Sequence, residues 1–297
     1  MRTPCEPRVT GVRFEHRRAS DALGIGSARP RVSWITETDA PGWRQAAYEV
    51  EVCDGRGDVM ATSGRVAADE SVLVPWPAEP LASRQRRQLR VRVWGTDGGE
   101  SDWSEPAAVE ASLLDPTDWT ACFVSPDPDG PAGAADDEAE PPTTAPTLLR
   151  REFEVAGPVE RARLHVTALG VYEVEINGTT VGDQVLAPGW TSYDHRLRVE
   201  TYDVTALVRS GANALGAWLA EGWYGGRLGW NGGQRVYGHR LALLAQLELT
   251  LADGTTQVVG TGADGTWRAH AAPILASGIY DGETYDARLE QPGWSSP

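Results

Sequence analysis

The chain contains no lysine, so all 27 of its basic residues are arginine. Its 42 acidic residues leave a net charge of −15. A protein that binds nucleic acid needs a concentrated basic face, and the only short basic run, SRQRRQLR at residues 83–90, lies among strand-like residues. We therefore expect no nucleic-acid partner, whereas a neutral ligand such as a sugar is compatible with the acidic balance.

Cysteine and long apolar runs are also scarce. Cys5, Cys53 and Cys122 lie far apart without a CxxC spacing, which argues against a zinc cluster or a redox pair. The chain has no run of about 18 apolar residues, the length that a membrane-spanning helix needs. Its charged N-terminus lacks the apolar stretch of a signal peptide. The sequence thus predicts a cytoplasmic protein without a membrane partner, and 297 residues suit two domains.

What the chain has in abundance is short, alternating apolar runs. In AYEVEV, Tyr48, Val50 and Val52 alternate with glutamates, and LRVRVW at residues 89–94 alternates apolar residues with arginines. Such runs are typical of strands with one buried face. About seven of them predict a fibronectin-III or immunoglobulin-like sandwich over residues 1–124. Residues 125–146, rich in proline and acids, predict a linker or mobile loop.

Strand patterns resume after the linker, and residues 147–297 predict a second, larger sandwich of the jelly-roll type. Asn177-Gly178 and Asp253-Gly254 indicate hairpins. A short helical turn is expected in VTALVRSG, between Asp203 as cap and Gly211. The fold class is therefore all-β, with two consecutive sandwiches.

No catalytic motif stands out. GxSxG, HExxH and GxxxxGK[ST] are absent, and the five histidines have no ligand spacing. Glycoside hydrolysis needs two carboxylic groups around one bond, but each candidate acid has an alternative in a turn or an ion pair. These candidates are Asp183, Asp194, Glu221, Asp281, Glu283 and Asp286. We assign no catalytic residue to this chain.

Aromatic, planar polar and glycine residues are concentrated in EGWYGGRLGWNGGQRVYG, residues 221–238. Sugar rings stack one face on aromatic rings while their hydroxyls bond to amides and guanidiniums, so this loop predicts a sugar site. Alternatively, Trp223 and Tyr224 are buried anchors towards a neighbouring domain. Trp190, which follows Pro188-Gly189, is expected to plug one end of the sandwich. The sugar-site candidates in this loop are Trp223, Tyr224, Arg227, Trp230 and Asn231.

The stretch from Val181 to Leu247 and the tail ASGIYDGETYDARLEQPGW resemble the N-terminal region of bacterial α-L-rhamnosidases. The resemblance implies release of terminal α-L-rhamnose with inversion by a C-terminal (α/α)6 barrel that these residues do not include. It also implies a rhamnose-binding role for the second sandwich, in which Asp183 and Gln184 would contact the sugar. No cofactor is required, and calcium, with Asp183 as its ligand, is the ion that the resemblance suggests.

Three interpretations remain open from the sequence. The first is the non-catalytic N-terminal part of an α-L-rhamnosidase that supports or recognises a rhamnose-containing glycan or glycoside. The second is a free-standing carbohydrate-binding module. The third is a purely structural spacer in a multidomain enzyme.

Overall fold

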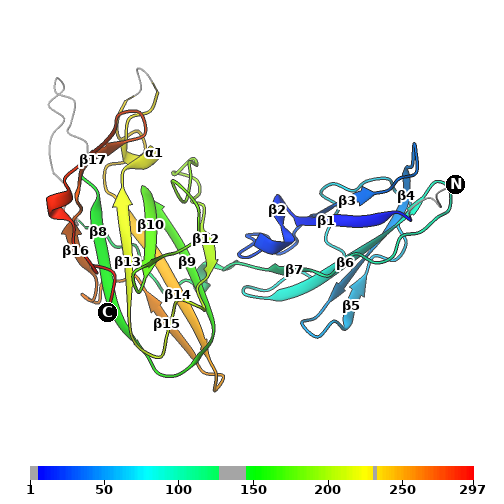
Figure 1. Ribbon diagram of the computed structural model, residues 1–297, viewed down its shortest axis with the longest axis horizontal. Helices are drawn as coiled ribbons and strands as arrows, with labels where there is room; N and C mark the ends of the chain where they lie inside the picture. Colours follow the sequence, from blue (N-terminus) through cyan, green and yellow to red (C-terminus); the bar gives the residue numbers. More distant parts are fainter. Residues whose placement is uncertain (1–5, 127–144, 230–232) are drawn as a thin grey trace. The chain divides into compact units, whose positions relative to one another are not determined.

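The computed structural model describes residues 6–126, 145–229 and 233–297 of the chain (Figure 1). The chain divides into two compact units, Met1–Asp118 and Trp119–Pro297. Antiparallel sheets make up nearly all of the regular structure, which confirms the predicted all-β class. Within the described ranges, no helix has the length and apolar character that a membrane crossing requires.

The first unit contains a three-stranded sheet of order β2-β1-β3 and a four-stranded sheet of order β5-β4-β6-β7. The alternation predicted the buried face correctly: Val50 and Val52 are each 1% exposed, and Val91 is fully buried. The strands are β1 (Arg8–Phe14), β2 (Arg17–Arg18), β3 (Val32–Glu37), β4 (Gln45–Cys53), β5 (Val59–Thr62), β6 (Arg86–Gly95) and β7 (Ala107–Glu110), with 3-10 turns at Ala19–Asp21 and Pro116–Asp118.

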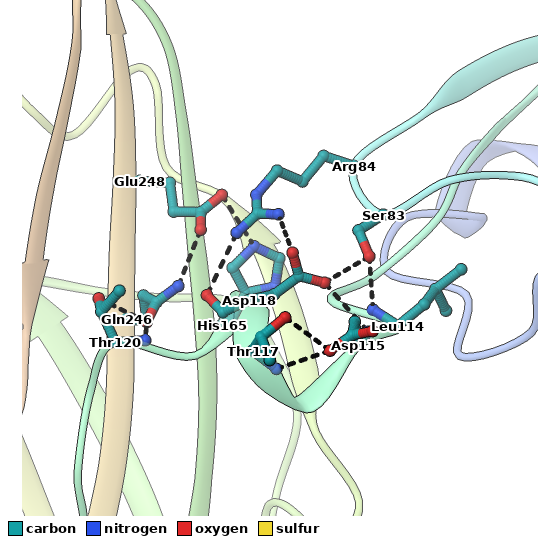
Figure 2. Close-up of polar contacts among 10 residues, drawn as sticks. All are labelled: Ser83, Arg84, Leu114, Asp115, Thr117, Asp118, Thr120, His165, Gln246 and Glu248. Carbon is teal, nitrogen blue, oxygen red and sulfur yellow. Dashed lines mark hydrogen bonds and ion pairs between the residues drawn. The ribbon is translucent and has the colours of Figure 1, made fainter.

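The carboxylate of Asp118 is the centre of a polar cluster at the end of the first unit (Figure 2). It accepts hydrogen bonds from the Ser83 hydroxyl and, at 3.0 Å, from the backbone N–H of Asp115. The Arg84 guanidinium lies 2.6 Å away. These contacts fix the last turn of the unit, Pro116–Asp118.

Residues 119–124 belong to the second unit. The Gln246 side-chain oxygen accepts hydrogen bonds from the backbone N–H groups of Thr120, at 2.8 Å, and Ala121, at 3.1 Å. Val124 pairs with Leu243 of β14 (Ala242–Leu251). The boundaries predicted from the sequence, 1–124, 125–146 and 147–297, stay predictions, and residues 127–144 of the predicted linker lie outside the described ones.

The second unit is a sandwich of a five-stranded sheet, β11-β10-β13-β8-β16, and a four-stranded sheet, β12-β9-β14-β15. Alternate residues of both sheets, such as Leu149, Leu164, Leu215 and Leu247, form one core. The elements are β8 (Thr147–Val155), β9 (Val159–Leu169), β10 (Val171–Ile176), β11 (Thr179–Thr180), β12 (Glu200–Asp203), β13 (Gly211–Ala220), α1 (Gly222–Gly225), β14 (Ala242–Leu251), β15 (Thr256–Gly260), β16 (Arg268–Ala271), β17 (Ile274–Gly278), β18 (Gly282–Tyr285) and a 3-10 turn at Ala287–Leu289. The jelly-roll assignment stays a prediction.

Both predicted hairpins of this unit are confirmed. Asn177 and Gly178 have φ values of 53° and 80° between β10 and β11, as a tight hairpin turn requires. Asp253-Gly254 joins β14 to β15. The predicted short helical turn after Asp203 is present as a single turn. The Asp203 carboxylate accepts from the backbone N–H of Thr205 at 3.1 Å, and the N–H of Val208 bonds to the Val204 carbonyl at 3.3 Å. The α-helical segment of the described residues is α1, in the glycine-rich loop.

Candidate functional site

Three connecting segments meet at one end of the second sandwich. They are the loop between β11 and β12, the segment from α1 to β14, and the tip of the β17–β18 hairpin (Figure 1). Loops gather at the ends of a sandwich because its strands run from one end to the other. Ring contacts and an ion pair join the segments. We call the rings that the first two segments contribute the aromatic end: Trp190, Tyr193, Trp223, Tyr224 and Tyr237.

The outer layer of the aromatic end is a tryptophan pair. Trp190 and Trp223 are stacked, with their ring centroids 6.3 Å apart and their planes at 9°. The indole N–H of Trp190 donates to the Tyr237 hydroxyl at 3.2 Å. Trp190 is 52% exposed, whereas Trp223 is partly buried against the core. The expectation that Trp190 plugs the sandwich is therefore wrong, because its stacking partner lies on a neighbouring loop and leaves the ring in solvent.

The inner layer consists of tyrosines. Tyr193 lies between Tyr224, at 5.3 Å, and Tyr237, at 5.0 Å between ring centroids. Burial, together with the charge that Tyr237 would carry, raises the pKa of Tyr193 to about 12. Burial, and secondarily the carboxylate of Asp194, raises the pKa of Tyr224 as well. Both hydroxyls therefore stay protonated at neutral pH and can only donate or accept hydrogen bonds.

Tyr224 is only 8% exposed, so of the two residues weighed as anchors it is the more deeply buried. A Cβ atom added at Gly238 would lie 2.2 Å from the Tyr224 hydroxyl oxygen, and Gly238 has a φ of 154°. Only glycine fits this close approach. Tyr224 thus supports the outer layer rather than offering its ring to solvent.

The hairpin tip brings Tyr280 and Asp281 against Arg227 of the segment from α1 to β14. Arg227 forms an ion pair with Asp281, and its guanidinium carbon lies 5.3 Å from the ring centroid of Tyr280. The Arg227 side chain is 24% exposed and that of Asp281 49%. Half-exposed aromatic faces next to a guanidinium and a carboxylate are the chemistry of a sugar site.

Asp183 and Gln184 lie on the β11–β12 loop, and both are exposed. Gln184 donates to the Glu200 carboxylate at 3.2 Å, and Arg198 pairs with the other oxygen of that buried group at 3.0 Å. No hydrogen bond, ion pair or ring contact of the described residues joins Asp183 or Gln184 to the aromatic end. These two predicted residues thus lie on one of the three segments that meet at this end, without a direct contact to its rings.

Calcium needs six to eight oxygen ligands. Among the described residues, no group of three or more His, Cys, Asp or Glu side chains gathers that could hold a metal ion. Calcium also accepts backbone and amide carbonyl oxygens as ligands, so the role of Asp183 as a calcium ligand stays a prediction. Trp230 and Asn231, two further predicted contacts, lie outside the described residues.

Sequence reasoning missed Tyr193 and took Trp190 for a plug. Tyr237 belongs to the mixture of aromatic and planar polar residues that we singled out in the glycine-rich stretch. Among the candidate acids, Glu221 is 5% exposed, and Asp286 pairs with Arg288 as expected, with 2.8 Å between Arg288 Nε and Asp286 Oδ1. The carboxylate of Asp281 forms an ion pair with Arg227, which gives this candidate acid a structural role.

Comparisons with known proteins agree with this architecture. Residues 157–297 match the family described as the α-L-rhamnosidase N-terminal domain. Residues 9–115 match the family described as the Rha78A-like, N-terminal immunoglobulin domain. Together the two families cover most of the chain.

Among curated proteins, an α-L-rhamnosidase of Formosa agariphila is 36% identical over 92% of this chain and 30% of its own length. A solved α-L-rhamnosidase from Aspergillus terreus is 43% identical, with a TM-score of 0.85, over 98% of this chain and 32% of its own. The solved α-L-rhamnosidase of Streptomyces avermitilis, complexed with L-rhamnose, is 30% identical, with a TM-score of 0.84, over 98% of this chain and 44% of its own. The chain thus spans less than half the length of each of these relatives.

Proposed function

The chain belongs to the N-terminal region of α-L-rhamnosidases, and from this premise we propose that it supports and recognises the substrate without catalysing the reaction. The whole protein would release terminal α-L-rhamnose, with inversion, from a glycan or glycoside. The acid and base of that reaction would lie in a part of the protein outside these residues. The aromatic end would bind the sugar ring.

The observation that carries the proposal is the exposure of Trp190. A tryptophan that only fills a core loses nearly all contact with water, yet 52% of Trp190 remains exposed. The ring is nevertheless held in place, by stacking on Trp223 and by the hydrogen bond to Tyr237. A fixed, exposed ring offers a ready surface to the apolar face of a sugar, because little entropy is lost when the sugar binds.

Polar recognition would come from Arg227 and Asp281. The Asp281 carboxylate keeps further hydrogen-bonding capacity in this ion pair, since a carboxylate has about four acceptor positions, and the Arg227 guanidinium also donates to the backbone oxygen of Gly229 at 3.3 Å. Both side chains are partly exposed. They are thus available to the hydroxyl groups of a sugar that stacks nearby.

The test is isothermal titration of the 297-residue chain with L-rhamnose, repeated on Trp190→Ala and Val185→Ala. Val185 lies on the same loop and is 88% exposed, so its variant is a matched control for loop damage. We expect saturable heat in the parent chain and in Val185→Ala, and at least about tenfold weaker binding in Trp190→Ala, from the loss of about 1.4 kcal/mol of ring contact. Chelator should leave the heat unchanged. Equal binding in all three chains would refute the aromatic end as the site.

A second candidate function is docking of the rest of the parent protein onto the aromatic end. The observation that favours it is aliphatic exposure, because Val185 is 88% and Val236 58% exposed, and a sugar site has little use for aliphatic side chains. Exposed apolar patches mark interaction surfaces. If docking is the function, the chain gives no heat with L-rhamnose, and Val185→Asp weakens association with the separately produced remainder of the parent.

A further inference from the structure

The outer face of the five-stranded sheet carries a groove of about 720 Å³ that has no part in the aromatic end. It lies along β8 and the edge strand β16, and the chain after Gln291 forms its other wall; Figure 1 shows β16 beside β8. The side chains that matter for its chemistry are Arg150, Glu152, Arg268, His270, Gln291 and Trp294.

The strand pattern explains why charged groups line the groove. Leu149 and Phe153 of β8 point into the core, so the alternate residues Arg150 and Glu152 point outward. In the register of β16 on β8, Arg268 lies directly opposite Arg150. Side chains opposite one another on antiparallel strands have Cβ atoms about 5 Å apart, and like charges in such pairs are destabilising.

Only one of these two arginines is compensated within the described residues. Arg150 forms an ion pair with Glu152 at 2.7 Å and donates to the backbone oxygen of Ser296. The Arg268 side chain forms no ion pair or hydrogen bond with any residue that the structure describes. In a chain with a net charge of −15, an arginine that lies opposite another arginine and has no ion-pair partner among the described residues indicates a site for an external anion.

The remaining walls suit a sugar. Trp294 is seated on Gly216, where an added Cβ atom would lie 2.6 Å from the indole ring. Its ring also meets Trp218 edge to face, at 5.9 Å. Gln291 and His270, which also line the groove, contact each other. The groove thus combines a fixed aromatic ring, planar amide and imidazole groups, and a free guanidinium.

We propose that this groove binds a carboxylate-bearing saccharide, such as a uronic acid residue of a glycan. The guanidinium of Arg268 would take the carboxylate in a two-pronged, charge-assisted hydrogen bond. Trp294 would contact the ring, and Gln291 and His270 the hydroxyls. Because none of these residues belongs to the aromatic end, this site and the proposed rhamnose site stand or fall separately.

The experiment titrates the 297-residue chain with methyl β-D-glucuronide and with methyl β-D-glucoside. The two sugars differ only at C6, which is a carboxylate in the glucuronide and a hydroxymethyl group in the glucoside. We expect saturable binding of the glucuronide and at least about tenfold weaker binding of the glucoside, since a charge-assisted hydrogen bond accounts for that ratio or more. Binding should weaken in 0.5 M salt, because an exposed ion pair is screened. Inorganic phosphate at equal concentration should not displace the glucuronide.

Four variants make the test specific. Arg268→Gln should lose about tenfold in glucuronide affinity, whereas Arg161→Gln on β9 of the other sheet should lose none. Glu152→Gln should bind the glucuronide more tightly, because it removes the competing carboxylate, and a gain of affinity cannot come from misfolding. Trp190→Ala should bind it unchanged. Equal affinity for both glycosides, displacement by phosphate alone, or no gain in Glu152→Gln would overturn the proposal.

Discussion

Replacement of Asp118 by asparagine should destabilise the first unit and leave the second unit unchanged. The Ser83 hydroxyl, and after it the Arg84 guanidinium and the Asp115 backbone N–H, stabilise the ionised carboxylate and lower its pKa from 3.8 to about 2. At ~1.36 kcal/mol per pKa unit the full shift would correspond to roughly 2.4 kcal/mol. The Arg84 side chain is 35% exposed, so solvent screening reduces the expected loss to about 1 kcal/mol.

The sign of the pH dependence follows from the lowered pKa. The contribution of Asp118 is fully present above its unfolded-state pKa of 3.8 and disappears as the pH falls through about 2. The difference in stability between the parent chain and Asp118→Asn should therefore be constant near neutral pH. About half of it should remain at about pH 3.

Differential scanning calorimetry can resolve the transitions of the two units. We expect Asp118→Asn to lower the midpoint of the first unit by about 4 °C at pH 7. Asp102→Asn provides the control, because this exposed aspartate of the same unit loses an equal charge without losing a contact. An equal shift in both variants, or a difference that does not shrink in acid, would refute the assignment of Asp118 as a stabilising carboxylate.

Two further predictions concern packing and thiol reactivity. Gly216→Ala should destabilise the second unit by about 1–3 kcal/mol, a typical cost of overpacking, because its Cβ atom would lie 2.6 Å from the Trp294 ring. Chemical denaturation should show this loss. The control Gly262→Ala, which has open space around its Cβ position, should not lower the stability. In a chain whose N-terminal cysteine is replaced by serine, a thiol reagent should modify the exposed Cys122 at once and Cys53 only on unfolding, since Cys53 is buried and burial raises its pKa. Rapid reaction of two thiols in the native chain would contradict the second prediction.

The sheets could be predicted because their signals are local. In a strand with one solvent-facing side, apolar and polar residues alternate, so the pattern repeats every two residues. A tight hairpin turn requires positive φ values, and Asn177 and Gly178 belong to the residue types that adopt them most easily. The position of the helix could not be predicted in this way. The segment from Asp203 to Gly211 forms the single turn that its capping residues indicate. The helix α1 forms at Gly222–Gly225, although two of its four residues are glycines that disfavour helices, because tertiary packing outweighs propensity.

The candidate site was predicted as a region but not as a set of contacts, because composition shows which residue types are concentrated in a segment but not which of them are buried. Residues 221–238 show that aromatic and planar polar side chains are concentrated there, but irregular backbone has no period from which burial can be read. Tyr224 and Trp223 are neighbours in sequence, yet Tyr224 is 8% exposed and packs under Tyr193, while Trp223 meets Trp190 from another loop. The exposed partner in that pair is the tryptophan that the sequence indicated as buried. Whether a ring binds ligand or fills a core is thus decided by contacts between segments more than 30 residues apart, and those contacts depend on the sandwich that brings the loops to one end.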